Sequence, residues 1–89
     1  MHKKVILSDI VHTVVDPRVN NGEDVAMAFV TRVNEVAGEE RLNLRVLLDT
    51  GADLRFSNVR FTNKRPTEDD EDTPRTVEGV QRVAFWPTR

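Results

Sequence analysis

The chain has 89 residues, of which 38% are hydrophobic, and a formal net charge of −2. This length predicts one domain over residues 1–89 with a single modest core, so we expect a homo-oligomer in which association adds stability. The absence of cysteine excludes a disulfide framework and a thiolate zinc site, and the apolar run 5–7 is too short for a signal peptide or a membrane span.

Alternating apolar and polar residues predict strands rather than helices in the first half of the chain. The first strand is expected over residues 5–15 and ends before Pro17, because proline has no N–H group to donate. A loop through residues 20–22 leads to a second strand over residues 25–36. A short helix within residues 23–37 is the competing interpretation, since that segment begins with fair helix formers.

The third strand, over residues 41–49, has the clearest period of two. It follows an expected hairpin turn at residues 37–40 and precedes another at residues 49–53. Its apolar positions predict one buried face, formed by Leu42, Leu44, Val46 and Leu48. In the second strand the same alternation places Phe29, Thr31 and Val33 on one face and Ala28, Val30 and Arg32 on the other.

The fourth strand, over residues 54–62, changes its alternation halfway. Leu54 and Phe56 have one parity and Val59 and Phe61 the other. We therefore predict a bulge near residues 57–58, because one extra residue shifts the phase of a strand and bends it.

A polar loop at residues 63–76 follows, which we expect to be exposed and mobile and to bury nothing. It contains the acidic run 68–72, without which 10 acidic residues face 13 basic ones. The body of the protein is therefore mildly basic, and phosphate-bearing partners stay compatible with its net charge. The last strand is expected over residues 80–86, with Val83 and Phe85 on one face and Ala84 and Trp86 on the other.

Five short strands in under 90 residues favour one small barrel, which buries a common core and leaves few open edges. We predict a mainly β, five-stranded antiparallel barrel. An SH3-like arrangement is preferred, because the middle strands form consecutive hairpins, and an OB-like arrangement is the second choice.

Three motifs suggest chemistry, and each is better explained by structure. Asp49, Thr50 and Gly51 resemble the active-site turn of retroviral aspartic proteases, but no flap sequence follows, so a hairpin turn is expected. The acidic run 68–72 lacks the ligand spacing of a calcium loop. His12 has no second spaced ligand for zinc. We therefore expect no enzyme activity, no metal and no cofactor.

Arginines on the expected strands are the remaining candidate site. Their guanidinium groups fork onto phosphates, and a nearby aromatic ring can stack a base. The alternative is that they only keep the solvent face of a small barrel soluble. The candidate ligand-binding residues are Arg32, Asn43, Arg45, Arg55 and Trp86.

The order of several short motifs resembles a group of small uncharacterised bacteriophage proteins. Those proteins carry a Val-Asn-Leu-x-Val strand and a C-terminal Trp-Pro ending. The corresponding segments here are 28–33, 42–46, 57–59 and Trp86-Pro87. The match departs at 83–87, where Val-Ala-Phe-Trp-Pro replaces Trp-His-Trp-Pro. The resemblance implies a phage or prophage origin and no named activity.

We therefore expect a non-catalytic phage-type binding module in the host cytoplasm, one that sequesters a nucleotide-type host immune signal. A virion structural or assembly protein, bound to other phage structural proteins, is the first alternative, since a small domain with a long loop can order on a neighbour. A nucleic-acid-binding small barrel is the second alternative.

Overall fold

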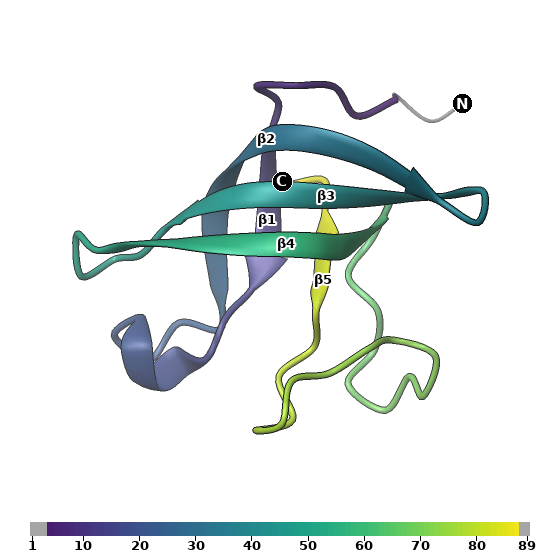
Figure 1. Cartoon of the computed structure of the whole chain (residues 1–89). Coiled ribbons are helices and arrows are strands. Elements are labelled where there is room, and N and C mark those ends of the chain that lie inside the picture. The colour runs from purple at the N-terminus through teal and green to yellow at the C-terminus, as the bar shows by residue number, and fades with distance from the viewer. Residues whose placement is uncertain (1–3, 88–89) are drawn as a thin grey trace.

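The computed structural model describes residues 4–87, which form a closed five-stranded β-barrel (Figure 1). The prediction of a mainly β small barrel is confirmed. The helical structure in this described range is limited to a short 3₁₀ helix, η1 (Pro17–Val19). The strands are β1 (Ile10–Val14), β2 (Val25–Val36), β3 (Glu39–Leu47), β4 (Asp53–Thr62) and β5 (Val83–Phe85).

Strands that follow one another along the chain are neighbours in the barrel, and β5 closes it between β4 and β1. This order is not the Greek key of an OB-fold and favours the SH3-like arrangement. One pair differs from the antiparallel prediction, because β5 runs parallel to β4. A parallel pair requires a crossover connection of about a dozen residues or more, and residues 63–82 provide it.

The core lies inside the barrel and is built from alternate residues of the strands. The predicted inward row of β3 is confirmed, because Leu42, Leu44 and Val46 and the following Leu48 are all buried. Neighbouring strands and the N-terminal segment complete this main core with Val5, Val11, Val15, Ala26, Ala28, Val30, Val59 and Ala84.

Two bulges bend the sheet at the same level. The bulge in β4 lies at residues 57–58, as predicted, and Asn58 has a φ of 55° there. A second bulge in β2, at Thr31, was not predicted. It reverses the expected faces beyond that point, so Val33 packs against the core and Arg32 is exposed on the outer face with Phe29.

Strand ends depart from the expected boundaries where local hydrogen bonds form turns. The first strand begins at Ile10 rather than residue 5, because the Asp9 N–H donates to the Ile6 carbonyl at 3.1 Å and Ser8 has a φ of 72°. The second hairpin turns within Ala37 and Gly38 alone, both at positive φ, which places the next two residues inside β3. Within the segment 23–37, Val25–Val36 form strand and no helix is present.

Strand β5 is shorter than expected and is covered on both faces. Ala84 belongs to the main core, and Val83 and Phe85 form a second small cluster with Val14. Part of its cover comes from the long connection 63–82, because Val80 packs against this second cluster. Within the connection, the side chain of Gln81 donates to the carbonyl of Thr67 at 2.9 Å.

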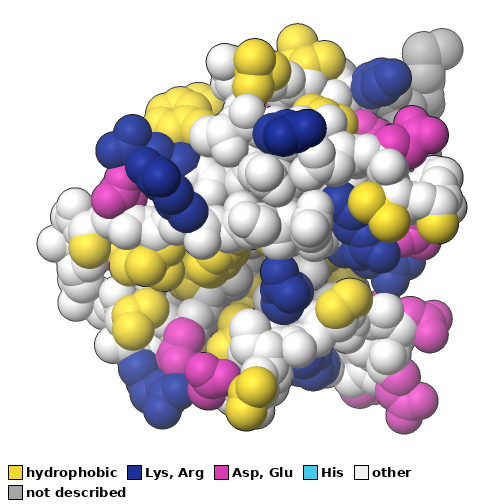
Figure 2. Space-filling model, viewed as in Figure 1, with side chains coloured by type: hydrophobic (Ala, Val, Ile, Leu, Met, Phe, Trp, Pro, Cys, Tyr) yellow, Lys and Arg dark blue, Asp and Glu magenta, His cyan; other side chains and the backbone are white. Residues whose placement is uncertain are grey.

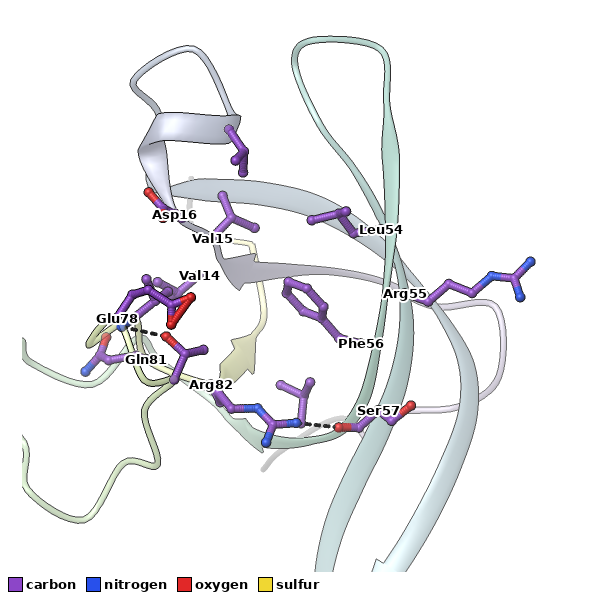
Figure 3. A pocket seen from close by; sticks show the side chains of 14 residues that line it. Val14, Val15, Asp16, Leu54, Arg55, Phe56, Ser57, Glu78, Gln81 and Arg82 are labelled. Carbon is purple, nitrogen blue, oxygen red and sulfur yellow. Dashed lines mark hydrogen bonds between the residues drawn. The ribbon is translucent and has the colours of Figure 1, made fainter.

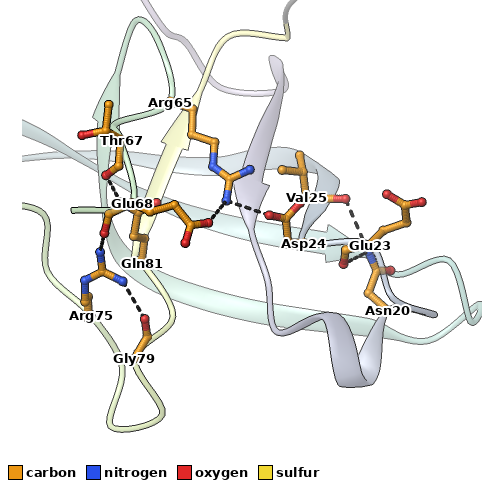
Figure 4. A network of polar contacts seen from close by, with 10 residues as sticks. All are labelled: Asn20, Glu23, Asp24, Val25, Arg65, Thr67, Glu68, Arg75, Gly79 and Gln81. Atoms are coloured by element: carbon orange, nitrogen blue, oxygen red, sulfur yellow. Dashed lines mark hydrogen bonds and ion pairs between the residues drawn. The ribbon is translucent and has the colours of Figure 1, made fainter. Parts of the chain in front are cut away.

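Polar contacts attach this connection to the barrel (Figure 4). The guanidinium of Arg65 pairs with the carboxylate of Asp24 at 2.8 Å and approaches Glu68 at 3.7 Å. The hydrogen bond from Arg65 holds the pKa of Asp24 below its ordinary value, because it favours the charged carboxylate. Thr73 is only 5% exposed, so the expectation that this polar loop buries nothing is wrong.

Candidate ligand-binding face

The strand register brings two of the predicted arginines together. Arg45 on β3 is directly opposite Arg55 on β4, and its other neighbour is Phe29 on β2. Directly opposite residues of an antiparallel pair have Cβ atoms about 4.5–5.5 Å apart, within reach of long side chains. Phe29, Arg45 and Arg55 therefore form one row across three strands.

All three side chains in this row are accessible on the outer face of the barrel. Phe29 is 38% exposed, and the Arg45 side chain is 58% exposed. The Arg45 Nε donates to the Asp53 carboxylate at 2.6 Å. Arg55 makes no ion pair or side-chain hydrogen bond within residues 4–87, so its guanidinium is free to take an anion.

More arginines lie on the same side of the sheet. Arg32 is opposite Asn43, and Arg41 is opposite Arg60. Figure 2, seen from the side of β2, β3 and β4, shows basic side chains spread across this surface and acidic ones mainly at its margins. We call this surface the arginine face, formed by Arg32, Arg41, Arg45, Arg55 and Arg60.

Two acidic residues neutralise part of this face. Arg41 pairs with Glu39 at 2.9 Å, as Arg45 does with Asp53. Arg60 instead donates to the backbone carbonyl of Asp72 at 3.0 Å, which leaves its charge uncompensated by that contact. The arginine face therefore keeps a positive balance within the described chain.

Asn43, a predicted ligand-binding residue, lies between the two bulges. Its side-chain oxygen accepts from the backbone N–H of Asn58 at 3.1 Å and from the amide of Asn34 at 3.2 Å. Its backbone carbonyl accepts from the hydroxyl of Thr31 at 3.1 Å. These bonds connect β2, β3 and β4 at the level of the two bulges, so Asn43 has a structural role in the barrel.

Trp86, the predicted stacking platform, is separated from the row of Arg45 and Arg55. It packs edge-on against Phe61 with ring centroids 5.1 Å apart and is partly buried against the main core. Phe61 is six residues beyond Arg55 on β4, on the far side of the bulge at 57–58. The aromatic ring beside the arginines is Phe29, which sequence analysis did not select.

The protease-like motif forms a hairpin turn, as expected. The backbone N–H of Gly51 donates to the Leu48 carbonyl at 3.0 Å, and Gly51 has a φ of 90°. The Asp49 carboxylate accepts from the side chain of Asn21 at 2.9 Å, and its backbone N–H donates to the side chain of Asn20 at 2.6 Å. Asp49 thus connects two loops of the barrel.

Within residues 4–87, no group of three or more histidine, aspartate or glutamate side chains is arranged to hold a metal ion. The same range contains no helix long and apolar enough to cross a membrane.

Comparisons with known proteins do not assign the chain to a family. No protein-family model, curated protein or solved structure matches it. Function therefore has to be inferred from the geometry and charge of the arginine face.

Proposed function

We propose that the protein is a non-catalytic binding module for a phosphate-bearing ligand of nucleotide type, held on the arginine face. The observation that carries the proposal is the row formed by Phe29, Arg45 and Arg55. Two guanidinium groups on adjacent strands can fork onto one phosphate group, and an exposed phenyl ring beside them can stack a base.

The ion pair between Arg45 and Asp53 does not prevent this binding. Both side chains are about half exposed, and an exposed ion pair contributes only about 0–1 kcal/mol. A phosphate that contacts Arg45 and Arg55 together offers more charge-assisted hydrogen bonds than the single carboxylate. The Asp53 carboxylate therefore competes only weakly with a ligand phosphate for the guanidinium of Arg45.

Calorimetric titration of the purified chain with cyclic mononucleotides, cyclic dinucleotides and cyclic ADP-ribose isomers tests the proposal. We expect at least one of them to bind and to raise the melting temperature by mass action. Arg55→Ala should weaken that binding at least about tenfold, equivalent to about 1.4 kcal/mol. Asp53→Asn should tighten it, because it releases Arg45.

Arg18→Ala is the matched control, since Arg18 is an exposed arginine on η1 and lies outside the arginine face. The affinity of Arg18→Ala for the nucleotide should equal that of the unmodified chain. Absence of binding to every ligand in the panel contradicts the proposal. Binding of single-stranded DNA or RNA in its place, with affinity that falls steeply with salt, favours the nucleic-acid alternative.

The proposed biological setting is that of a bacteriophage protein acting in the host cytoplasm, where it sequesters a nucleotide-type immune signal. The resemblance of its motif order to that of small phage proteins supports this setting. In bacteria that use such a signal against phage, expression of the chain should restore plaque formation, and Arg55→Ala should abolish the effect. Equal restoration by both chains contradicts sequestration through the arginine face.

The second candidate function is that of a virion structural or assembly protein. With it we propose that copies of the chain associate with one another. Exposed apolar side chains on the N-terminal segment and the first two strands favour this candidate: Ile6, Leu7, Ile10 and Met27. Such side chains mark surfaces that other proteins or further copies cover. Mass spectrometry of purified particles distinguishes the candidates, because a sequestering protein is absent from them.

A further inference from the structure

The barrel is closed on one side by a strand too short to fill its place. β5 pairs with β4 only at Arg60–Thr62 and with β1 only at His12 and Thr13. Residues 54–59 of β4 pair with β3 and have no strand of the described chain on their other side. Between the first half of β4 and the end of β1, the barrel wall therefore lacks a strand, and residues 76–82 of the connection lie beside the gap. We call this place the open seam.

A cavity of about 380 Å³ occupies the open seam (Figure 3). Its wall is mainly apolar, with Leu54 and Phe56 directed into it and Val15 facing them. Charged residues, including Asp16, Glu78 and Arg82, stand around this apolar centre. Arg55 also lines the cavity, but its side chain points away from the apolar wall, so the arginine face and the open seam use opposite sides of β4.

The exposed edge of β4 determines what kind of ligand fits. In a strand, about half of the backbone N–H and C=O groups point toward each neighbouring strand, and an edge without a neighbour leaves them unpaired. Across the open seam, Arg82 Nη2 donates to the Ser57 carbonyl at 2.7 Å. A side chain thus already occupies one of the positions that a strand's N–H would take.

We propose that the open seam binds an extended segment of another protein, which adds to the barrel as a strand along residues 54–59 of β4. Only a polypeptide offers alternating donors and acceptors at the spacing of this edge. β5 demonstrates the fit, because one strand spans the gap between β1 and β4 at the closed end.

The apolar wall of the cavity determines which side chains the bound segment should carry. Alternate residues of an added strand point to the same side, so every second side chain faces Phe56 and Leu54 and should be apolar. The rim carries both signs of charge, with Asp16 and Glu78 beside Arg82, so it has no positive balance that would attract a phosphate-bearing ligand. Asp16 stays charged, because its hydrogen bonds with Arg18 keep the pKa of its carboxyl below the ordinary value.

Selection from a displayed library of random seven-residue peptides on the immobilised full chain tests the proposal. We expect enriched peptides with apolar residues at alternate positions. The best peptide, made synthetically, should shift the backbone amide resonances of residues 54–58. N-methylation of alternate amides should weaken its binding at least tenfold in one register and little in the other, because only one register hydrogen-bonds to β4.

Matched substitutions separate the open seam from other surfaces. Leu54→Lys should abolish peptide binding, whereas Met27→Lys, at another partly exposed apolar position, should retain it. Circular dichroism confirms that both variants fold. Arg45→Ala, on β3 and outside the cavity lining, should leave peptide binding unchanged while weakening nucleotide binding, so failure of one proposal is distinguishable from failure of the other.

Three results would overturn the inference. One is that the library yields no peptide that binds the unmodified chain better than Leu54→Lys. Another is that binding is insensitive to N-methylation in both registers. The third is that the resonances that shift belong to the arginine face rather than to residues 54–58.

Discussion

Asn43 is a single residue on which the curvature of the sheet depends. Asn43→Ala removes the acceptor for the Asn58 N–H and the Asn34 amide, so we expect the free energy of unfolding to fall by roughly 1–2 kcal/mol. Urea denaturation measures this change. A variant of unchanged stability that loses nucleotide binding would show instead that Asn43 contacts the ligand.

The ion pair of Arg65 with Asp24 predicts a pH dependence of stability. The folded-state pKa of Asp24 is depressed, so its contribution is present above the unfolded pKa, about 3.9, and is lost as the pH falls through the lower folded value. Near neutral pH, Arg65→Ala should lower the free energy of unfolding by at most about 1 kcal/mol, since the pair is partly exposed.

This difference between Arg65→Ala and the unmodified chain should shrink as the pH falls below the unfolded pKa of about 3.9 and vanish once Asp24 is protonated in the folded state. Chemical denaturation at several pH values between about 2 and 7 measures it. If the difference persists at low pH, packing of the Arg65 side chain rather than its charge is responsible.

Among the elements, the hairpin between β2 and β3 contains a position where a substitution should stabilise the protein. Ala37 has a φ of 52°, a left-handed conformation that costs an alanine about 1–2 kcal/mol. Asparagine tolerates this conformation, and Asn-Gly is the preferred pair in such turns. Ala37→Asn should therefore raise the free energy of unfolding by about 0.5–1 kcal/mol and the melting temperature by a few degrees. Gly38→Ala should act in the opposite direction.

The alternation of apolar and polar residues predicted correctly which residues are buried in strands with a regular pattern. It failed where a bulge adds an extra residue to the strand. β3 has no bulge, and its buried row was found from sequence. The phase change in β4 revealed its bulge, because large apolar residues lie on both sides of it. In β2 the residues around Thr31 gave no such signal, so the prediction wrongly grouped Val33 with Phe29 and Arg32 with Val30.

The candidate row depended on that same unseen bulge. Pairing outward from the turn at Ala37 and Gly38 without a bulge sets Arg45 opposite Val30, an inward residue. The bulge moves the register by one and sets Arg45 opposite Phe29. Arg45 and Arg55 were selected from composition and strand face alone, and their pairing required the turn geometry at residues 48–52 as well.

At the scale of the whole molecule, the placement of Trp86 and the direction of β5 depend on the path of the connection 63–82. No local pattern encodes that path, because it results from contacts between distant residues such as Arg65 and Asp24. The sequence indicated a barrel through strand number and spacing. It gave no indication that one strand pair would be parallel or that the seam beside it would be open.

Self-association is a prediction about the whole molecule. Sedimentation of the chain at increasing concentration should show a species larger than the 10.2 kDa monomer. Ile10→Lys should shift the equilibrium toward monomer, because it charges the exposed apolar surface of β1. A monomer at every concentration up to about millimolar would contradict both self-association and the expected gain in stability.

Closure of the barrel joins His12 to Phe85, two residues at opposite ends of the described chain. During synthesis on the ribosome, the first four strands emerge while β5 is still being made. Until β5 is synthesised, the nascent sheet of four strands therefore has an unpaired edge at β1 and another at β4. Molecular chaperones or neighbouring nascent chains have their best access to these edges in that interval. Slowing translation over residues 63–82 would lengthen it and should increase aggregation without changing any residue of the finished protein.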